Sequence, residues 1–259
     1  MAGPRPGHLR WGLEKFPQAR HKAAMTDDRQ GDRNARRLRS YGRRKGKRLT
    51  ARKERLVAEL LPALRPRLSE PAPATLRDLF SVPVREVWLE IGFGAGEHLL
   101  WQALANPDIG IVGCEPFLNG VSSLLGGIDD HGIETVRIHD GDGREVLDWL
   151  PEHSISRAFI LFPDPWPKKR QAKRRLVTPQ LVQALARVLR SGGELRFASD
   201  DLNYVREALL AIGGDRAFAW TASRASDWRA RPADWPETRY ERKALSESRK
   251  PVYLRFTRL

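Results

Sequence analysis

A single carboxylate and a single indole stand among closely spaced prolines in the segment Phe162-Pro163-Asp164-Pro165-Trp166-Pro167. The prolines at 163 and 165 fix φ at their own positions, and they bias Phe162 and Asp164 towards an extended backbone. A basic run begins directly behind this segment, at Lys168. A rigidly held acid with cations behind it predicts a site in which Asp164 faces a nucleobase and the basic run faces phosphate groups.

Two residues of this segment also have a purely structural interpretation. Asp164 can cap its own turn, because aspartate side chains often accept hydrogen bonds from the backbone two residues further on. Trp166 is compatible both with stacking on a displaced base and with filling the core, and the sequence does not choose between these roles.

The basic run holds six cations within eight residues. They are Lys168, Lys169, Arg170, Lys173, Arg174 and Arg175. Lys and Arg side chains neutralise nucleic-acid phosphates, so the run is expected to bind phosphates beside the site. A solvated helix face is the alternative.

A glycine-rich segment, Gly92-Phe93-Gly94-Ala95-Gly96, lies between a predicted strand and a predicted helix. Gly92, Gly94 and Gly96 permit positive φ and let the backbone approach a ligand closely. Their GxGxG spacing differs from the GxGxxG of dinucleotide-binding folds. Glu97 places negative charge at the helix start, which disfavours a phosphate and suits a cationic or neutral ligand.

Three acidic residues accompany the glycine segment. Glu90 precedes it in the same strand. Glu115 ends the second strand, 19 residues after Gly96. A carboxylate at this position binds ribose hydroxyls in nucleotide-binding folds. Asp142 follows the third strand and is expected at an adenine edge, with Asp140 as the alternative. An acid-lined pocket without phosphate predicts S-adenosylmethionine, which carries a sulfonium, a ribose and an adenine. A tight turn with ordinary surface carboxylates is the structural alternative.

These residues fall at the ends of alternating strands and helices. The pattern predicts strands at 84–91, 109–114, 135–139, 156–162, 194–198, 217–221 and 252–257, and helices at 50–64, 97–105, 118–126, 144–150, 179–190 and 202–211. Parallel strands need crossover connections, so five successive strand–helix units imply an α/β fold with a doubly wound, mostly parallel seven-stranded sheet. Ligands bind at the carboxyl edge of such a sheet, where Asp200 also lies, after the fifth strand.

Local signals predict where some of these elements end. Pro62 is expected to end or kink the helix at 50–64, and Ser191-Gly192-Gly193 to close the helix that begins at Thr178-Pro179. Residues 222–251 join the last two strands as a long loop, and such loops tend to be functional. Trp228 and Trp235 in this loop are expected to be packing residues.

Positive charge is concentrated near the N-terminus. Residues 1–55 hold 18 Lys or Arg and 5 Asp or Glu, so they carry +13 of the net charge of +14. A basic arm at 1–48 before a nearly neutral domain at 49–259 is typical of a polyanion-binding protein, with a solvated tail as the alternative. The Arg, Gly and Pro content of the arm, without apolar periodicity, predicts disorder.

Composition excludes several function classes. One cysteine, Cys114, rules out disulfide scaffolds and cysteine zinc sites within the chain, and the six histidines show no metal-binding spacing, so no metal is expected. No apolar run reaches the ~18 residues of a membrane span, and no signal peptide is recognised. The expected location is the cytoplasm, and both a monomer and a homodimer remain open.

Five segments together resemble the bacterial tRNA (guanine-N7)-methyltransferase family. In chain order they are LEIGFGAGEHL, GCEPF, FPDPWPKKRQAKRRL, FASDDLNY and TRYE, within residues 85–257. The proline-framed block with its basic run is the most specific, and YGRRKGKRL resembles a leader found in some members. Pro167 and the glycine-rich stretch at 139–143 depart from the family pattern.

The resemblance implies a class I, Rossmann-like methyltransferase that uses S-adenosylmethionine to methylate N7 of a guanine in the variable loop of tRNA. It implies Glu90, Glu115 and Asp142 as S-adenosylmethionine contacts and Asp164 at the catalytic position. The substrate contacts that it implies are Lys168, Asp200, Thr238, Arg239, Tyr240 and Glu241.

Methylation of guanine N7 is a reaction that one acidic residue, Asp164, can support. N7 carries a free lone pair at neutral pH and needs no base, while Asp164 can accept hydrogen bonds from the guanine edge and stabilise its developing charge. An exocyclic-amine methyltransferase, suggested by Asp-Pro-Trp, and a non-catalytic RNA-binding protein of this fold are the alternatives. The identity of the product and the binding of S-adenosylmethionine separate the three.

Overall fold

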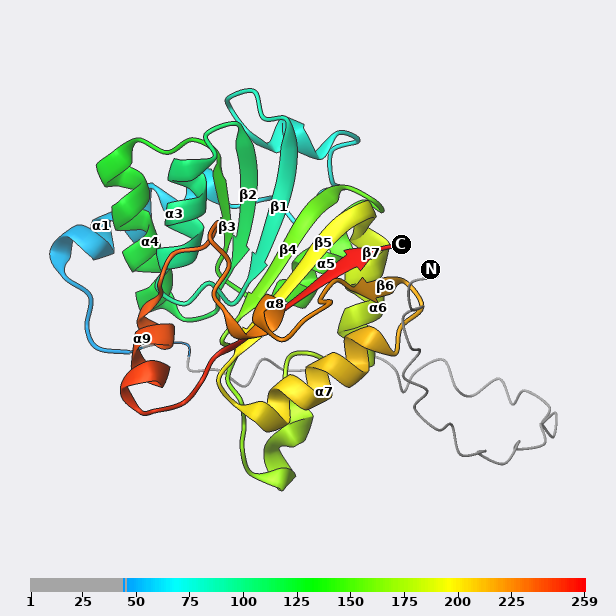
Figure 1. The fold of residues 1–259 in the computed structure, drawn as a ribbon. Helices are drawn as coiled ribbons and strands as arrows, with labels where there is room; N and C mark the ends of the chain where they lie inside the picture. The colour runs from blue at the N-terminus through cyan, green and yellow to red at the C-terminus, as the bar shows by residue number, and fades with distance from the viewer. Residues whose placement is uncertain (1–43, 45) are drawn as a thin grey trace, which may run out of the picture. The chain divides into compact units, whose positions relative to one another are not determined.

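Parallel strands built from apolar runs form the centre of the molecule. The computed structural model describes Arg44 and residues 46–259, and within them one seven-stranded sheet has the order β3-β2-β1-β4-β5-β7-β6 (Figure 1). Its strands are β1 (Glu86–Ile91), β2 (Ile109–Cys114), β3 (Val136–His139), β4 (Ile155–Leu161), β5 (Leu189–Ser199), β6 (Phe218–Trp220) and β7 (Val252–Arg258). Pairs among β1 to β5 are parallel, and β7 pairs antiparallel with β5 and β6. The predicted mostly parallel sheet is confirmed.

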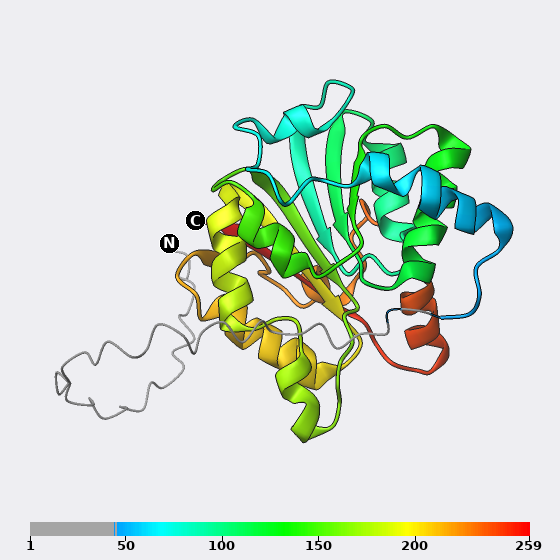
Figure 2. The ribbon, with the colours of Figure 1, turned by 180° about the vertical axis from the view of Figure 1, so that it is seen from behind.

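Helices cover both faces of this sheet (Figures 1 and 2). They are α1 (Ala51–Glu59), α2 (Leu61–Leu64), α3 (Glu97–Ala105), α4 (Leu118–His131), α5 (Gly143–Trp149), α6 (Pro179–Val188), α7 (Leu202–Gly213), α8 (Ser226–Arg229) and α9 (Arg239–Ser246), with 3₁₀ helices η1 (Leu76–Leu79) and η2 (Lys169–Arg174). Buried side chains of α1 to α4 form one core cluster with Trp88 and Phe159. Those of α5 to α7 form a second cluster with Leu89 and Ile160, which project from the other face. This doubly wound arrangement confirms the predicted fold class.

The carboxyl ends of the central strands meet at one edge of the sheet. Ile91 of β1 pairs with Cys114 of β2, so Gly92 and Glu115 leave their strands side by side. Phe162 follows β4, and its N–H donates to the end of β5 at 2.7 Å. The residues predicted to form a site therefore start from a common edge, where open α/β sheets bind ligands.

The junction between α6 and β5 differs from its prediction. α6 ends at Val188, and Ser191-Gly192-Gly193, which was expected to close it, lies inside β5. Leu189 already pairs with Ile155 of β4, after which the ladder shifts its register. Gly192 has a φ of 74°, so the glycines accommodate a strand irregularity rather than a helix end.

Proline and glycine act differently in two other helices. The helix predicted at 50–64 breaks just before Pro62, as expected, because α1 ends at Glu59 and α2 begins at Leu61. α4 instead continues past its predicted end at 126 to His131. A Cβ on Gly127 would lie 2.5 Å from the Leu100 side chain, so this glycine serves close helix packing and does not stop the helix.

Residues 222–251, predicted as one loop, contain α8 and α9. Trp235 is 2% exposed, and its ring packs 5.5 Å from that of Tyr253, while Trp228 packs partly buried on the second core cluster. The predicted packing role of both tryptophans is confirmed. The short helices depend on such long-range contacts, because helices of this length are not stable alone.

The remaining predicted elements begin and end within two residues of those observed. The predicted arm at 1–48 lies outside the described residues except for Arg44 and 46–48, so its disorder stays a prediction. Within the described part of the chain, no helix has the length and apolar character needed to cross a membrane.

Candidate active site

The glycine segment leaves β1 in a turn that favours glycine at three positions. Gly92, Gly94 and Gly96 have φ values of 79°, 59° and 82°, a region that residues with a Cβ rarely adopt. The N–H of Gly92 donates to the Cys114 carbonyl of β2, and the N–H of Gly96 donates to the Phe93 carbonyl. The positive φ predicted for these glycines is confirmed.

Glu115 holds this loop from the neighbouring strand. Its Oε2 accepts from the Gly94 N–H at 2.8 Å, and its Oε1 accepts from the Phe117 N–H at 2.9 Å. Burial raises the pKa of Glu115, and the two backbone donors oppose this rise. Each oxygen keeps a second lone pair, which a carboxylate needs in order to accept from ribose hydroxyls.

Glu90 lies in a pocket beside the glycine loop. Glu90 is 2% exposed, and its Oε2 is 2.7 Å from Nδ1 of His98 on α3. The pocket is lined by Glu90, Gly92, Phe93, Ala95, Glu97, His98, Leu161, Phe162, Thr238 and Tyr240. Among the described residues, no three His, Cys, Asp or Glu side chains lie together as metal ligands do. Acidic and glycine residues of the β1 region thus share one pocket with α9.

The two aspartates after β3 are each bound to an arginine. Asp142 begins α5, where its Oδ1 accepts from the Arg144 N–H at 3.0 Å and its carboxylate pairs with the Arg144 guanidinium. Asp140 pairs with Arg65 after α2, at 2.7 and 2.6 Å. Burial alone would raise the pKa of Asp140, but the interactions with Arg65 outweigh burial and lower it. Asp142 therefore caps α5, whereas Asp140 anchors α2 to the end of β3.

A strained turn presents Asp164 at the sheet edge. Phe162 and Trp166, each followed by a proline, have φ values of 48° and 44°, so the extended backbone predicted for Phe162 is wrong. Bulky residues rarely adopt this left-handed region. The turn is held at its far end by Arg175, whose Nε donates to the Pro165 carbonyl at 2.7 Å. Backbone strain of this kind persists where surrounding contacts over-determine it, as at functional turns.

The Asp164 side chain is exposed to solvent. Among residues 46–259, no hydrogen bond or ion pair reaches its carboxylate, so the interpretation in which Asp164 only caps its own turn is wrong. Burial raises the pKa of Glu115 and of Tyr240, and the negative charge of Asp164 adds to both rises. The negative charge of Asp164 is therefore felt at both Glu115 and Tyr240.

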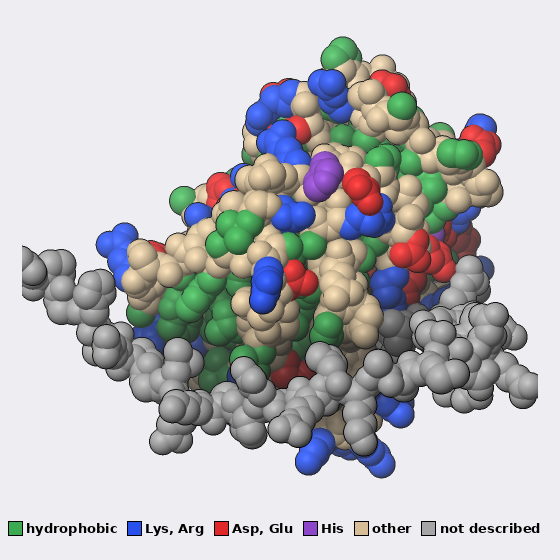
Figure 3. Space-filling view, turned by 90° about the vertical axis from the view of Figure 1, so that its right-hand side faces the viewer, with side chains coloured by type: hydrophobic (Ala, Val, Ile, Leu, Met, Phe, Trp, Pro, Cys, Tyr) green, Lys and Arg blue, Asp and Glu red, His purple; other side chains and the backbone are tan. Residues whose placement is uncertain are grey.

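The basic run divides into exposed and structural cations. Lys168, Lys169, Arg170 and Lys173 are exposed. Arg175 is 6% exposed, pairs with Glu207 and lies 5.0 Å over the Tyr204 ring, which corrects its prediction as a phosphate ligand. Arg174 lies 4.9 Å over the half-buried ring of Trp166. On the face of the molecule that Figure 3 shows, Lys and Arg side chains are interspersed with Asp and Glu.

Asp200 follows β5 at the same sheet edge, as predicted. Its Oδ2 accepts from Nε of Arg249 at 2.6 Å. The neighbouring Asp201 caps α7 by accepting from the Tyr204 N–H at 2.8 Å. The ion pair of Asp200 ties the chain that follows α9 to the end of β5.

α9 closes on the glycine loop from a distant part of the sequence. The N–H and the guanidinium of Arg239 donate to Glu97 at 2.6 and 2.8 Å, across 142 residues of chain. Burial opposes the ionisation of Glu97, but Arg239 outweighs it and lowers the pKa of that carboxyl. Tyr240 lies so close to Gly94 that a Cβ on this glycine would sit 3.0 Å from the ring. The charge at the start of α3 is thus compensated by α9.

Thr238 and Glu241 are buried and hold α9 to the sheet. Oγ1 of Thr238 caps the helix by accepting from the Glu241 N–H at 3.3 Å, the arrangement that a T-x-x-E segment favours. Oε1 of Glu241 accepts from the Tyr253 hydroxyl at 2.6 Å and from Nε of Arg231 at 2.9 Å. Its Oε2 is buried and has no hydrogen-bond partner among the described residues.

We expect Glu241→Ala to lower the free energy of unfolding by about 2–3 kcal/mol, because it leaves Arg231 and the Tyr253 hydroxyl without their acceptor. Glu241→Gln keeps an acceptor oxygen and should lose less. Urea unfolding of both variants and the wild type measures the difference. Wild-type stability of the alanine variant would contradict this account of the contacts.

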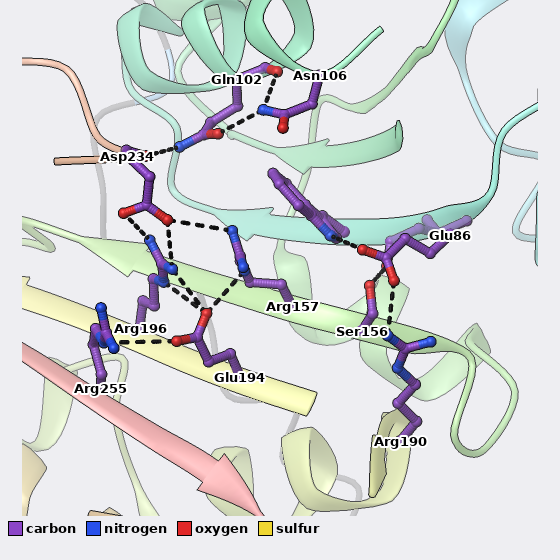
Figure 4. A network of polar contacts seen from close by, with 12 residues as sticks. Glu86, Gln102, Asn106, Ser156, Arg157, Arg190, Glu194, Arg196, Asp234 and Arg255 are labelled. Atoms are coloured by element: carbon purple, nitrogen blue, oxygen red, sulfur yellow. Dashed lines mark hydrogen bonds and ion pairs between the residues drawn. The ribbon is translucent and has the colours of Figure 1, made fainter. Parts of the chain in front are cut away.

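A network of arginines and acids holds the segment before α9 (Figure 4). Arg196 of β5 is 2% exposed and donates to both oxygens of Asp234, at 3.0 and 2.8 Å. Glu194 accepts from Arg196 at 2.8 Å and from Arg157 of β4 at 2.9 Å. No sequence motif indicates this network, because its members come from two strands and a distant loop and share no local pattern.

Comparisons with known proteins agree on one family. A family model described as "Putative methyltransferase" matches residues 84–254. The tRNA (guanine-N(7)-)-methyltransferase of Rhodospirillum rubrum is 51% identical and covers 85% of this chain and 88% of its own. That of Ruegeria pomeroyi is 51% identical, covering 85% and 94%, and that of Rhizobium meliloti is 47% identical, covering 84% and 94%.

A solved structure shares the fold. The 16S rRNA methyltransferase KamB superimposes with a TM-score of 0.51 at 14% sequence identity, and the match covers 73% of this chain and 95% of that one. At this level of identity the likeness concerns the fold alone, and it agrees with the doubly wound sheet described above.

Proposed function

The chain belongs to the tRNA (guanine-N(7)-)-methyltransferase family, and from this premise we propose that the sheet edge around Asp164 is its active site. The enzyme transfers a methyl group from S-adenosylmethionine to N7 of a guanine in tRNA. The observation that carries the site proposal is the Asp164 carboxylate. It is exposed, lacks a partner among residues 46–259, and sits on a strained turn at the sheet edge.

The residues at this edge fit S-adenosylmethionine. Glu115 keeps lone pairs for ribose hydroxyls, and Glu90 brings negative charge into the pocket that a sulfonium would favour. Because Glu97 is an acid at the start of α3, the loop is unsuited to a pyrophosphate. The contacts that we assign to S-adenosylmethionine are Glu90, Gly92, Gly94, Gly96, Glu115 and Asp142.

The reaction needs positioning and charge more than proton transfer. When bound, S-adenosylmethionine supplies a methyl carbon on a cationic sulfur, and the carbon–sulfur bond breaks as guanine N7 takes the methyl group. The lone pair of N7 is free at neutral pH, so the protein need not supply a base. The positive charge moves onto the guanine ring, which makes the ring N–H groups stronger hydrogen-bond donors.

Asp164 meets this need with one fixed negative charge. In the proposed complex its carboxylate accepts from the guanine N1–H and amino group and stabilises the cation that forms. The strained turn holds the carboxylate in place before the base arrives, so little reorganisation is required during the reaction.

The tRNA contacts surround this position. Those that we propose are Lys168, Asp200, Thr238, Arg239, Tyr240 and Glu241. Exposed Lys168 is suited to a phosphate, exposed Tyr240 to stacking, and the unpartnered Oε2 of Glu241 to an N–H of the substrate. We further propose that the reaction takes place in the cytoplasm, with the enzyme as a monomer or homodimer.

A labelled-product experiment tests the function directly. The protein is incubated with radiolabelled S-adenosylmethionine and tRNA, the tRNA is digested, and the labelled nucleoside is identified. We expect 7-methylguanosine alone. Label in an exocyclic amine would point to amine methylation, and absence of both label and S-adenosylmethionine binding would point to an RNA-binding protein without catalysis.

We expect deletion of residues 1–43 to lower the affinity for tRNA and to make that affinity less dependent on salt concentration. Each lost phosphate contact should lower the slope of log K against log salt concentration by about 0.9. Residues 46 and 47 are kept because the Gly46 N–H and the Lys47 carbonyl bond to Asn119 of α4. Binding is measured by fluorescence anisotropy at several salt concentrations. An unchanged slope would mean that the deleted residues do not touch phosphates.

A further inference from the structure

A chain of hydrogen bonds runs from the pocket to the segment before α9. Nδ1 of His98 lies 2.7 Å from Glu90 Oε2, and Nε2 of His98 lies 3.1 Å from Nε2 of Gln102. The same Gln102 nitrogen donates to the Asp234 carbonyl at 2.9 Å. His98 and Gln102 are one turn apart on α3 and are 3% and 2% exposed. Neither residue has a place in the mechanism above.

Main-chain carbonyls set the direction of these hydrogen bonds, because they only accept. The Gln102 carbonyl accepts from Asn106 Nδ2 at 2.9 Å, and the same nitrogen donates to Gln102 Oε1 at 3.1 Å. The Asp234 carbonyl requires the amide nitrogen of Gln102 on its side. A flipped Gln102 amide would place two donors together at Asn106 and two acceptors together at Asp234. The partners therefore allow one orientation of the amide.

This orientation determines the tautomer of His98. The second amide hydrogen of Gln102 points at His98 Nε2, which must accept it and therefore carries no proton. The proton of a neutral His98 lies on Nδ1 and is donated to Glu90. An imidazolium would turn its Nε2–H towards the amide hydrogens of Gln102, with no acceptor between them.

Packing holds the chain in this arrangement. The ring of His98 lies between those of Phe159, at 4.7 Å, and Trp235, at 5.4 Å. Asp234 is held through both carboxylate oxygens by Arg196. Figure 4 shows the Gln102 side chain reaching the Asp234 segment on one side and Asn106 on the other. The imidazole is thus fixed by buried ring contacts, and the far end of the chain is fixed by the buried Arg196.

We propose that Gln102 and His98 are positioning residues, and that Gln102 serves both substrates through its two amide hydrogens. One hydrogen orients the Glu90 carboxylate by way of His98, and the other places the segment at 234–241. This inference rests on the proposed function, in which Glu90 contacts S-adenosylmethionine and α9 contacts tRNA. His98 affects only the binding of S-adenosylmethionine, because its hydrogen bond through Nδ1 is with Glu90 and not with the segment at 234–241.

Binding measurements on variants separate these effects. Gln102→Met keeps a similar volume but loses both hydrogens, and it should weaken binding of S-adenosylmethionine and of tRNA by about tenfold each. His98→Leu should weaken only S-adenosylmethionine binding, by a similar factor. His98→Asn should bind S-adenosylmethionine more tightly than His98→Leu does, because the asparagine amide nitrogen lies near the place of Nδ1 and still donates to Glu90.

The control is Gln180→Met, on the exposed face of α6. It makes the same chemical change and should leave both affinities at the wild-type value. Calorimetry without tRNA measures S-adenosylmethionine binding, and fluorescence anisotropy measures tRNA binding. A Gln102→Met variant that binds either ligand as tightly as the wild type does would overturn the shared role.

The tautomer gives a test on the wild-type protein. Nitrogen-15 NMR of the histidine-labelled protein should show one side chain, identified by its nuclear Overhauser contacts with the rings of Phe159 and Trp235, with a proton on Nδ1 and none on Nε2 at neutral pH. A proton on Nε2 would overturn the inference even if every variant failed to fold. A wild-type protein that bound no S-adenosylmethionine and made no 7-methylguanosine would instead contradict the proposed function.

Discussion

The Asp164→Asn variant is expected to methylate tRNA with a kcat about 10²–10³-fold below that of the wild type. Asparagine keeps the size of the side chain and one acceptor oxygen, but it removes the negative charge that we propose offsets the cationic guanine in the transition state. Asp164 is exposed and makes no hydrogen bond or ion pair within residues 46–259, so its replacement breaks no contact of the described protein.

The kinetic pattern distinguishes this role from a structural one. The affinity for S-adenosylhomocysteine and the unfolding midpoint should stay at wild-type values, because the charge is needed in the transition state and not for folding. Asp148→Asn, an exposed aspartate in α5, is the matched control and should retain its kcat. An Asp164→Asn enzyme with wild-type kcat would show that the carboxylate takes no part in the reaction.

The Gly120→Ala variant is expected to lose most of its affinity for S-adenosylmethionine. A Cβ on Gly120 of α4 would lie 2.0 Å from the carbonyl oxygen of Gly94, so either the helix or the glycine loop has to move. The N–H of Gly94 also donates to Glu115, so a displaced loop disturbs the proposed ribose contact. Overpacking of this kind costs about 1–3 kcal/mol of stability, and calorimetry and thermal unfolding measure both effects.

Gly126→Ala provides the control within the same helix. A Cβ at Gly126 meets no atom within 4 Å, so alanine should raise the free energy of unfolding by about 0.5–1 kcal/mol through its better helix propensity. Its affinity for S-adenosylmethionine should equal that of the wild type. If Gly120→Ala also bound S-adenosylmethionine normally, close packing of α4 on the glycine loop would not matter for the site.

Long-range contacts account for what the sequence analysis did not predict. Arg175 has the same side chain as the exposed Arg170 of the basic run, and only the approach of Glu207 and Tyr204 turns it into a buried structural residue. Gln102 carries no motif, and its partner Asp234 lies 132 residues away. The left-handed backbone at Phe162 runs against local preference, because contacts with neighbouring elements impose it.

The sequence by itself determined the fold class, the glycine turn after β1, the acids at the strand ends and the proline-framed Asp164. These features depend on periodicity, on backbone preferences and on the topology of parallel strands, all of which act over a few residues or follow from the order of elements. Only the tertiary structure decided which polar side chains are exposed, which are engaged by a partner, and how α9 closes on the glycine loop. Those outcomes depend on hydrogen bonds and packing between residues far apart in the sequence, by 132 positions for Gln102 and Asp234 and by 142 for Glu97 and Arg239, and no local pattern records them.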